Sequence, residues 1–546
     1  MLGHLKATII IMFCVVAAAF FIRLVDRNKN MVPHVIAWGL LIPVIFMTQS
    51  YILIMIILVL LKLLYLKNDE VKNISMFLSL FVVLPFTVRF PLIPGVNLID
   101  VSVVQMLVLV FFIPLSLRII RSEEFSFHRL DFAALAFMLI LLIGNFRETS
   151  EYEFTWFQAF RDSVDMILVT VLPYFVISRG LRNIQAIDYA LAGLLFGGLT
   201  MAFFAVFEAV LVWRPYVEIG ALVGTMPGIE SMYEIRGRFL RVTGSLTGPI
   251  TFGFYLTIIL ATTLYYLRKT GKPAVFMVGM IGFLLLVMFM TGSRAALLGG
   301  LLFSGLYFLY SLDRTTRRVL VVPLVIVAFA GVFISESMQQ GSDTPELEEV
   351  DQYGTFEYRK RLFQTALQVI PDNLLVGTRE YRNDDRMKTL IQGQNIIDMV
   401  NGFIHITIEY GIVAFLLLIF ILARSYRVLT SAKLLELDPL ENPDDDPLTE
   451  IEIDTPTAEF NFNDIDSEDE EKVVDPAVLQ RWRLFFGQAF AALLVSLCLQ
   501  FSFTSYSSTI VPLLWISLGL IRAFQLGLMH KELDEDDEDE FDFVSV

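Results

Sequence analysis

Arginine is the residue type whose clusters could do chemistry in this chain. The stretch "IRGRFLRVTG" holds Arg236, Arg238 and Arg241, and Arg294 stands alone in "MTGSRAALLGG", between two apolar runs. Five more arginines lie between positions 359 and 386. A guanidinium group offers a rigid fork of N–H donors that can hold two phosphate oxygens at once. Arginines that converge on one site would therefore bind a strongly anionic group such as a pyrophosphate.

Simpler roles compete with anion binding for some of these arginines. Those in "GTREYRNDDRMK" (377–388) stand among acidic residues, so we expect them to be solvated or paired locally. Arg359 and Arg361 belong to "EYRKRLFQTALQVI", whose amphipathic pattern also suits a helix that faces lipid headgroups. Arg294 is different, because an ionisable residue at membrane depth is costly and tends to be functional or paired.

A proton acceptor would complete such a site, and the segment "DMVNGFIHITIEYG" offers three titratable side chains. Glu409 follows His405 by one helical turn, so the two share a helix face. Asp398 precedes the same predicted helix. A lone histidine at a helix end is more often structural than catalytic, yet any of these groups could serve as a general base near the membrane surface.

The elements that must position these residues are predicted to be membrane-spanning helices. The chain has 546 residues, of which 56% are hydrophobic, and its mean hydropathy is +0.66. Its solid apolar runs suit helices, since about 20 apolar residues cross a hydrocarbon layer of roughly 30 Å. We predict an all-α polytopic membrane protein with about 13 to 15 spans, because the second and third runs are nearly fused. The predicted spans are about 7–22, 32–48, 51–66, 74–88, 101–117, 131–146, 165–178, 187–212, 250–267, 273–290, 295–312, 319–335, 404–423, 484–502 and 509–525.

Basic loops assign the two sides of the membrane. The segments "KNDEVKN", "RIIRSEEFSFHR", "SRGLRN", "RKTGK", "DRTTRR" and "ARSYR" follow alternate spans, and short Lys/Arg-rich loops stay in the cytoplasm. The remaining loops then face the periplasm or exterior, and they contain Arg241, Arg294 and the long loop 336–403. Arginine is disfavoured on that side, so its accumulation there predicts a function.

Two acidic segments account for the formal net charge of −16. Residues 434–475 hold 17 acidic residues and one lysine, and residues 531–546 hold nine acidic residues and one lysine. We expect 434–480 and the tail 531–546 to be disordered in the cytoplasm, because they cannot bury enough apolar surface to fold. The predicted parts are N-terminal helices (1–130), a transmembrane core (131–433), the acidic loop (434–480), a C-terminal hairpin (481–530) and the acidic tail (531–546).

The sequence shows no signature of a metal or cofactor site. It has no P-loop, no GxGxxG fingerprint and no metal-ligand spacing, and its five histidines are scattered. Its two cysteines, Cys14 and Cys498, lie inside apolar spans and cannot form a disulfide framework. We expect no metal, no cofactor and no nucleic-acid partner.

The order of three motifs resembles the O-antigen ligase and O-antigen polymerase family. These motifs are "RVTGSLTGPITFGFYL", "MTGSRAALLG" and, after the long outer loop, "VNGFIHITIEYGIVAFLL". The resemblance is strongest over about 180–425. It implies a C-type glycosyltransferase-like fold in the bacterial inner membrane, with the active site facing the periplasm. A glycan on an undecaprenyl-pyrophosphate carrier would be the donor, and a growing glycan or lipid A core sugar would be the acceptor. The other partners implied are membrane lipids and, as an open option, a chain-length regulator.

The resemblance also assigns residues. By motif position the family's pyrophosphate-binding arginines fall on Arg241 and Arg294, to which the charge argument adds Arg238 and Arg361. The family's candidate base is a histidine at the position of Val400, so this chain departs from the pattern. Asp398 and His405 are the nearest titratable groups and become the candidate catalytic residues. Polymerase, ligase and other polysaccharide transferases therefore stay open.

Two other functions compete with glycan transfer. Outward arginines would also suit a transporter of an anion or small solute, but a transporter favours paired repeats and ionisable groups near mid-membrane. The sequence shows neither feature. A non-catalytic assembly protein that recruits a basic partner through its acidic segments is the third option.

Overall fold

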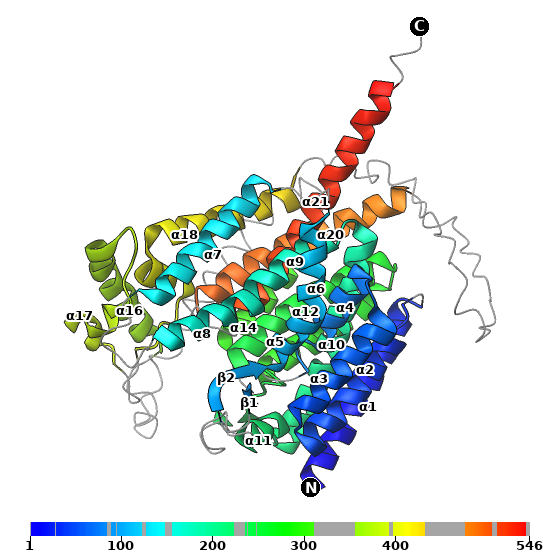
Figure 1. The fold of residues 1–546 in the computed structure, drawn as a ribbon, viewed down its shortest axis with the longest axis horizontal. Helices are drawn as coiled ribbons and strands as arrows, with labels where there is room; N and C mark the ends of the chain where they lie inside the picture. The colour runs from blue at the N-terminus through cyan, green and yellow to red at the C-terminus, as the bar shows by residue number, and fades with distance from the viewer. Residues whose placement is uncertain are drawn as a thin grey trace, which may run out of the picture.

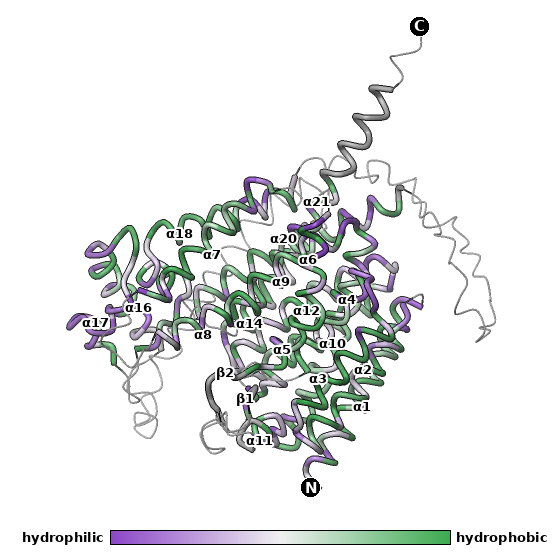
Figure 2. Tube along the Cα trace, in the orientation of Figure 1, coloured by the Kyte–Doolittle hydropathy of each residue, from purple (hydrophilic) through white to green (hydrophobic). Residues whose placement is uncertain are grey.

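The chain folds into a helical bundle, seen in the computed structural model of Figure 1. The structure describes residues 2–27, 29–83, 89–93, 96–122, 127–147, 156–222, 235–236, 239–246, 248–310, 355–391, 397–431, 476–504 and 510–541. Apolar residues cover the helices, and hydrophilic residues gather toward their ends and around α16 and α17 (Figure 2). The predicted all-α polytopic membrane fold is confirmed.

Eight helices of the described residues are long and apolar enough to cross a membrane. They are α1 (Leu2–Val25), the continuous helix α5–η3–α6 (Val103–Ile120), α7 (Arg129–Phe146), α10 (Ile184–Leu211), α12 (Pro249–Lys269), α18 (Gly402–Leu429), α20 (Pro476–Phe501) and α21 (Val511–Phe541). Four shorter apolar helices accompany them: α2–η1 (Val32–Thr48), α3–η2 (Tyr51–Leu66), α13 (Ala274–Met290) and α14 (Arg294–Tyr310). The predicted span 319–335 lies outside the described residues.

Three further helical segments complete the bundle: α4 (Glu70–Leu80), α8–η4–α9 (Trp156–Gly180) and α11 (Pro215–Leu222). The second and third predicted spans are two helices rather than one. They meet in a turn where Gln49 adopts a left-handed φ of 54°.

Helix α10 lies at the centre and packs closely on α4. A Cβ at Gly193 would lie 2.2 Å from the carbonyl oxygen of Ser75, and one at Gly197 would lie 2.5 Å from that of Ser79. Small residues four apart let two membrane helices approach backbone to backbone, and dispersion contacts then hold them together. This contact fixes the scaffold from which the loops of the site extend.

The loops sort into two groups at opposite ends of the bundle. At one end, the inner end, Asp26 and Asp188 both pair with Lys269, at 3.5 Å and 2.7 Å. At the other, the outer end, the Lys6 amino group lies 4.9 Å from the centre of the Trp213 ring. The basic-loop pattern places the segments next to Asp188 and Lys269 on one side of the membrane, and the contact between these two residues agrees with that alternation.

The outer end contains two short strand pairs that the sequence did not predict. Strands β1 (Arg89–Ile93) and β2 (Val96–Ser102) form an antiparallel hairpin, and β3 (Ile235–Arg236) pairs with β4 (Phe239–Leu240). The long loop folds into α16 (Thr355–Val369), η7 (Ile370–Asn373), η8 (Glu380–Asn383) and α17 (Asp385–Lys388). It has a small hydrophobic core of its own, centred on Tyr358, Leu362 and Met387.

Two expectations about the acidic segments need correction. Helix α21 continues to Phe541, so the tail predicted to be disordered from 531 is helical through that residue. The first part of α21 is already helical, so the helix can extend into the acidic tail without a new nucleation cost. Helix α20 begins at Pro476, inside the predicted disordered segment 434–480. Residues 432–475 lie outside the described residues.

Candidate functional site

Arg241 and Arg294 meet at one turn of the outer end. Arg241 Nε donates to the carbonyl oxygen of Thr291 at 3.1 Å, and Val242 N donates to that of Met290, also at 3.1 Å. Helix α14 begins at Arg294, three residues after Thr291. The two arginines predicted to bind the same anion therefore come from segments more than 50 positions apart and flank one tight turn.

A buried carboxylate holds the Arg241 loop in place. Glu208, near the end of α10, accepts hydrogen bonds from Thr243 N at 3.1 Å and Gly244 N at 2.8 Å. It also pairs with Arg214 Nε at 3.2 Å, and Arg214 donates to the carbonyl oxygen of Arg241. Because both charged side chains are almost fully buried, their mutual pairing fixes the path of the loop. Sequence reasoning missed this pair, although an acid inside the span 187–212 was a signal that a partner must exist.

Helix α16 brings a third arginine to the site. The Arg359 guanidinium lies 5.1 Å from the centre of the Phe503 ring and interacts electrostatically with Asp398 and Arg294. Burial lowers the pKa of Arg359, and the charge of Arg294 lowers it further, while Asp398 opposes the shift. Arg361, the arginine predicted from this helix, is exposed. Arg238 lies outside the described residues, so its role stays a prediction.

Asp398 stands beside these arginines. It lies on the surface just before α18, and its carbonyl oxygen accepts a hydrogen bond from Tyr358 OH at 2.8 Å. Removal of water by the surrounding protein raises the pKa of the Asp398 carboxyl, while Arg359 and His405 act against that rise. A raised pKa makes a carboxylate a better proton acceptor.

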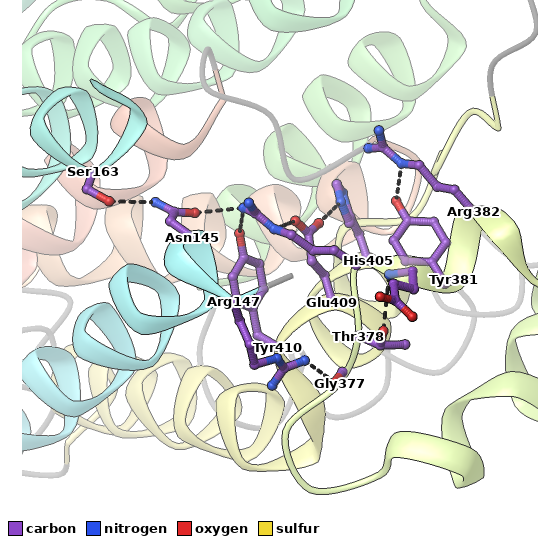
Figure 3. A network of polar contacts seen from close by, with 12 residues as sticks. Asn145, Arg147, Ser163, Gly377, Thr378, Tyr381, Arg382, His405, Glu409 and Tyr410 are labelled. Carbon is purple, nitrogen blue, oxygen red and sulfur yellow. Dashed lines mark hydrogen bonds and ion pairs between the residues drawn. The ribbon is translucent and has the colours of Figure 1, made fainter. Parts of the chain in front are cut away.

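His405 belongs to a hydrogen-bond network that links three helices, α18, α7 and α8, through the outer loop (Figure 3). Its Nε2 lies 2.5 Å from Glu409 Oε2, and the other oxygen, Oε1, accepts from Arg379 Nε at 2.7 Å. Arg379 Nη2 also donates to Asn145 Oδ1 at 2.7 Å, and Asn145 Nδ2 donates to Ser163 Oγ at 3.3 Å. Glu409 is thus shared between the imidazole ring and a guanidinium group.

The expectation that the arginines of 377–388 are solvated or locally paired is wrong for Arg379. Its ion-pair partner Glu409 is 30 positions away in the sequence. The expectation holds for Arg386, which pairs with Asp384 and Asp372. The physical reason is the cost of burial: an unpaired carboxylate inside α18 would lose its hydration without compensation, whereas exposed acids are stabilised by water.

Helix α18 is broken where it meets the outer loop. Gly411 has φ 85° and ψ 173°, so the helical hydrogen-bond pattern is interrupted next to Glu409. The loop supplies the missing bonds: Thr378 N donates to Ile408 O at 2.7 Å, and Ile412 N donates to Leu374 O at 2.8 Å. The break lets the loop dock on the helix and places Arg379 against Glu409.

Within the described residues, no group of three or more His, Cys, Asp or Glu side chains could hold a metal ion. The charged groups of the site are therefore arginines, single carboxylates and one imidazole. Such a set can bind an anion and accept a proton.

Comparison with known proteins assigns part of the chain. The O-antigen ligase family matches residues 279–419, which include Arg294, Arg359, Arg379, Asp398 and His405. Arg241 and Glu208 precede the matched region. No curated protein matches the chain. The match confirms the family resemblance over the region that contains the second and third motifs, and it supports a membrane enzyme of the O-antigen ligase and polymerase type.

Proposed function

Given that residues 279–419 carry an O-antigen ligase domain, we propose that this protein transfers a glycan from an undecaprenyl-pyrophosphate carrier to a sugar acceptor. The reaction would occur at the periplasmic face of the bacterial inner membrane, as an O-antigen or exopolysaccharide polymerase or as a ligase. The observation that carries the proposal is the meeting of Arg241, Arg294 and Arg359 at the outer end, beside Asp398.

The three arginines suit the leaving group. In the transfer, the bond between the sugar C1 and the diphosphate oxygen breaks, and a bond from the acceptor oxygen to C1 forms. Negative charge grows on the diphosphate as it leaves, and guanidinium groups fixed in advance stabilise that charge without reorganising. Arg241 is fixed through Thr291 and the Glu208–Arg214 pair, and Arg359 is held against Phe503.

The acceptor hydroxyl must lose a proton, and Asp398 is the residue that we propose takes it. Its carboxylate lies near Arg359, so base and leaving-group site are adjacent. Because His405 is bonded to Glu409, we propose it as a positioning residue and not as the proton acceptor. Positioning and electrostatics would then supply most of the rate.

Purified protein in detergent micelles tests the proposal directly. Incubated with a lipid-linked glycan and an acceptor glycan, the wild type should form a longer or transferred glycan. Arg241→Ala, Arg294→Ala and Arg359→Ala should each lower the transfer rate at least roughly a hundredfold, as expected when a preorganised charge contact is lost. Arg386→Ala is the matched control, because this half-buried arginine of the same loop pairs with Asp372 and Asp384 and donates to the carbonyl oxygen of Gln368, all within the loop.

The same assay separates the rival functions. A micelle has no two compartments, so a transporter would show no chemical change of the glycan there. Full transfer by Arg294→Ala and Arg359→Ala would overturn the assigned site. A comparison of Arg361→Ala with Arg359→Ala decides which arginine of α16 contacts the substrate, and we expect only Arg359→Ala to be impaired.

A further inference from the structure

The outer loop contains an exposed apolar turn at its contact with α18. Leu374, Leu375 and Val376 are 44%, 65% and 61% exposed. The turn lies against the helix break: a Cβ on Gly411 would be 2.2 Å from the carbonyl oxygen of Leu375. Three consecutive exposed apolar residues on a loop of a polar subdomain need a partner.

The depth of this turn along α18 can be estimated from the helix itself. The first charged residue toward the inner end is Arg424, which is exposed. Gly411 is 13 residues before it, or about 20 Å at 1.5 Å per residue. Since the hydrocarbon layer is roughly 30 Å thick, the break lies inside it and not above it.

Helix α7 gives the same depth independently. It begins at Arg129, and a Cβ on Gly144 would lie 2.7 Å from the Tyr410 ring, next to the break. Gly144 is 15 residues from Arg129, again about 22 Å. Two helices, each measured from its inner end, therefore place the turn at one level, in the outer half of the bilayer.

The exposure of apolar side chains on α18 changes at the break, as expected if the helix faces lipid only on the inner side of Gly411. No residue from Gly402 to Tyr410 is exposed, whereas Val413, Leu416 and Phe420 are 43%, 57% and 48% exposed. The apolar turn thus continues the lipid-facing surface of α18.

Several backbone groups in and next to the turn have hydrogen-bond partners within the protein. Non-helical backbone at membrane depth needs internal hydrogen-bond partners, because lipid offers none. Leu374 O accepts from Ile412 N at 2.8 Å, and Val376 O accepts from Arg147 Nη1 at 2.8 Å. Gly377 N donates to Asn373 O at 2.8 Å, and Arg147 also donates to Gly377 O, as Figure 3 shows.

We propose that the Leu374–Val376 turn is a re-entrant hook that inserts among the acyl chains of the outer leaflet. Its occupant is bilayer lipid. The hook holds the outer loop, with Arg379 and the adjoining site, against the outer leaflet. This inference concerns lipid contact and stands whether or not glycan transfer is the reaction.

Photolabelling tests the hook in the unmodified full-length protein. In nanodiscs whose lipid carries a diazirine on the acyl chain, light should attach lipid to the peptide containing 374–376 as well as to the lipid-facing part of α18. Labelling of α18 around Leu416 without any labelling of 374–376 would overturn the proposal.

A second measurement reports depth. In a C14A/C498A background, an environment-sensitive fluorophore on Leu375→Cys should emit at shorter wavelength and be quenched by nitroxides on acyl chains. The control is Asp385→Cys in the same loop, whose native side chain is 95% exposed and which should respond to neither. Leu375→Cys that behaves like Asp385→Cys, or that instead forms a disulfide-linked dimer and resists quenching, would refute insertion into lipid.

Discussion

Substituting Gly411 tests whether the break in α18 holds the outer end together. Its φ of 85° with ψ of 173° lies in a region that only glycine occupies at ease, so an alanine there costs of order 1–3 kcal/mol in backbone strain. Its Cβ would lie 2.2 Å and 2.5 Å from backbone atoms of Leu375 and 2.7 Å from Val376 N. Backbone cannot rotate away as a side chain can, so the loop must move off the helix.

That movement breaks the hydrogen bonds of Ile412 N and Thr378 N, each worth about 1 kcal/mol net. Together with the strain, Gly411→Ala should cost about 3–5 kcal/mol. Transfer activity should be lost as well, because Arg379 can no longer reach Glu409.

Two control glycines separate the contributions. Gly271 has φ 60°, and a Cβ there would have no atom within 4 Å, so Gly271→Ala should cost only the strain, about 1–2 kcal/mol. Gly279 is helical and open, so Gly279→Ala should be neutral or slightly stabilising. Thermal unfolding in one detergent should rank Gly279→Ala above Gly271→Ala and both above Gly411→Ala. Equal melting of Gly411→Ala and Gly271→Ala would refute the close backbone contact.

Three further predictions follow from the site. Glu208→Gln should raise KM for the lipid-linked donor roughly tenfold and change kcat less. The substitution weakens about one hydrogen bond to a charged group and so loosens the Arg241 loop. Unchanged steady-state constants would contradict this. Arg379→Lys, which loses the fork between Glu409 and Asn145, should lower kcat/KM roughly ten- to a hundredfold, whereas Arg386→Lys should not. The transfer rate should fall as pH drops through the raised pKa of Asp398, above the usual value of about 4, because the base then becomes protonated; an identical acid limb in Asp398→Asn would exclude it as the base.

The helical fold could be predicted because its cause is local. An apolar run of sufficient length forces a helix in lipid whatever the rest of the chain does. The grouping of loops at two ends of the bundle was predicted from the same kind of local information, the Lys and Arg content of short loops, and which end faces the periplasm stays a prediction. The contact of Asp188 with Lys269 agrees with that grouping.

The pairings of the site could not be predicted from neighbouring residues. Arg379 has acidic residues beside it in sequence, yet its partner is Glu409, because the break at Gly411 brings the loop to the helix. Glu208 and Arg214 were missed for a similar reason. A stricter use of one principle would have found both pairs: a carboxylate inside an apolar span requires a cation, and arginines of adjacent outer loops are the available ones.

The β1–β2 hairpin and the helical end of α21 show a different limit. Residues 89–102 lack a regular alternation of apolar and polar side chains, and the hairpin forms where Arg89 pairs with Asp165 at 3.1 Å. Composition predicted disorder for 531–546, but helix continuation depends on what precedes a segment. Both elements take their structure from context.

At the outer end, a buried glutamate of a membrane span pairs with an arginine in two places. These pairs explain how loops can form a precise site. Glu208 in α10 and Glu409 in α18 are nearly buried carboxylates at the outer parts of two spans, and each is paired with an arginine. Each also lies where an outer loop makes backbone hydrogen bonds to the span or its carboxylate, at Gly244 and at Thr378. A buried ion pair adds little net stability compared with an apolar pair, but its directed bonds select one geometry. The glycan transfer that we propose would need its cationic groups fixed before charge develops on the leaving diphosphate. Two such ion pairs would hold Arg241 on one side of the proposed site and the loop of Arg359 on the other.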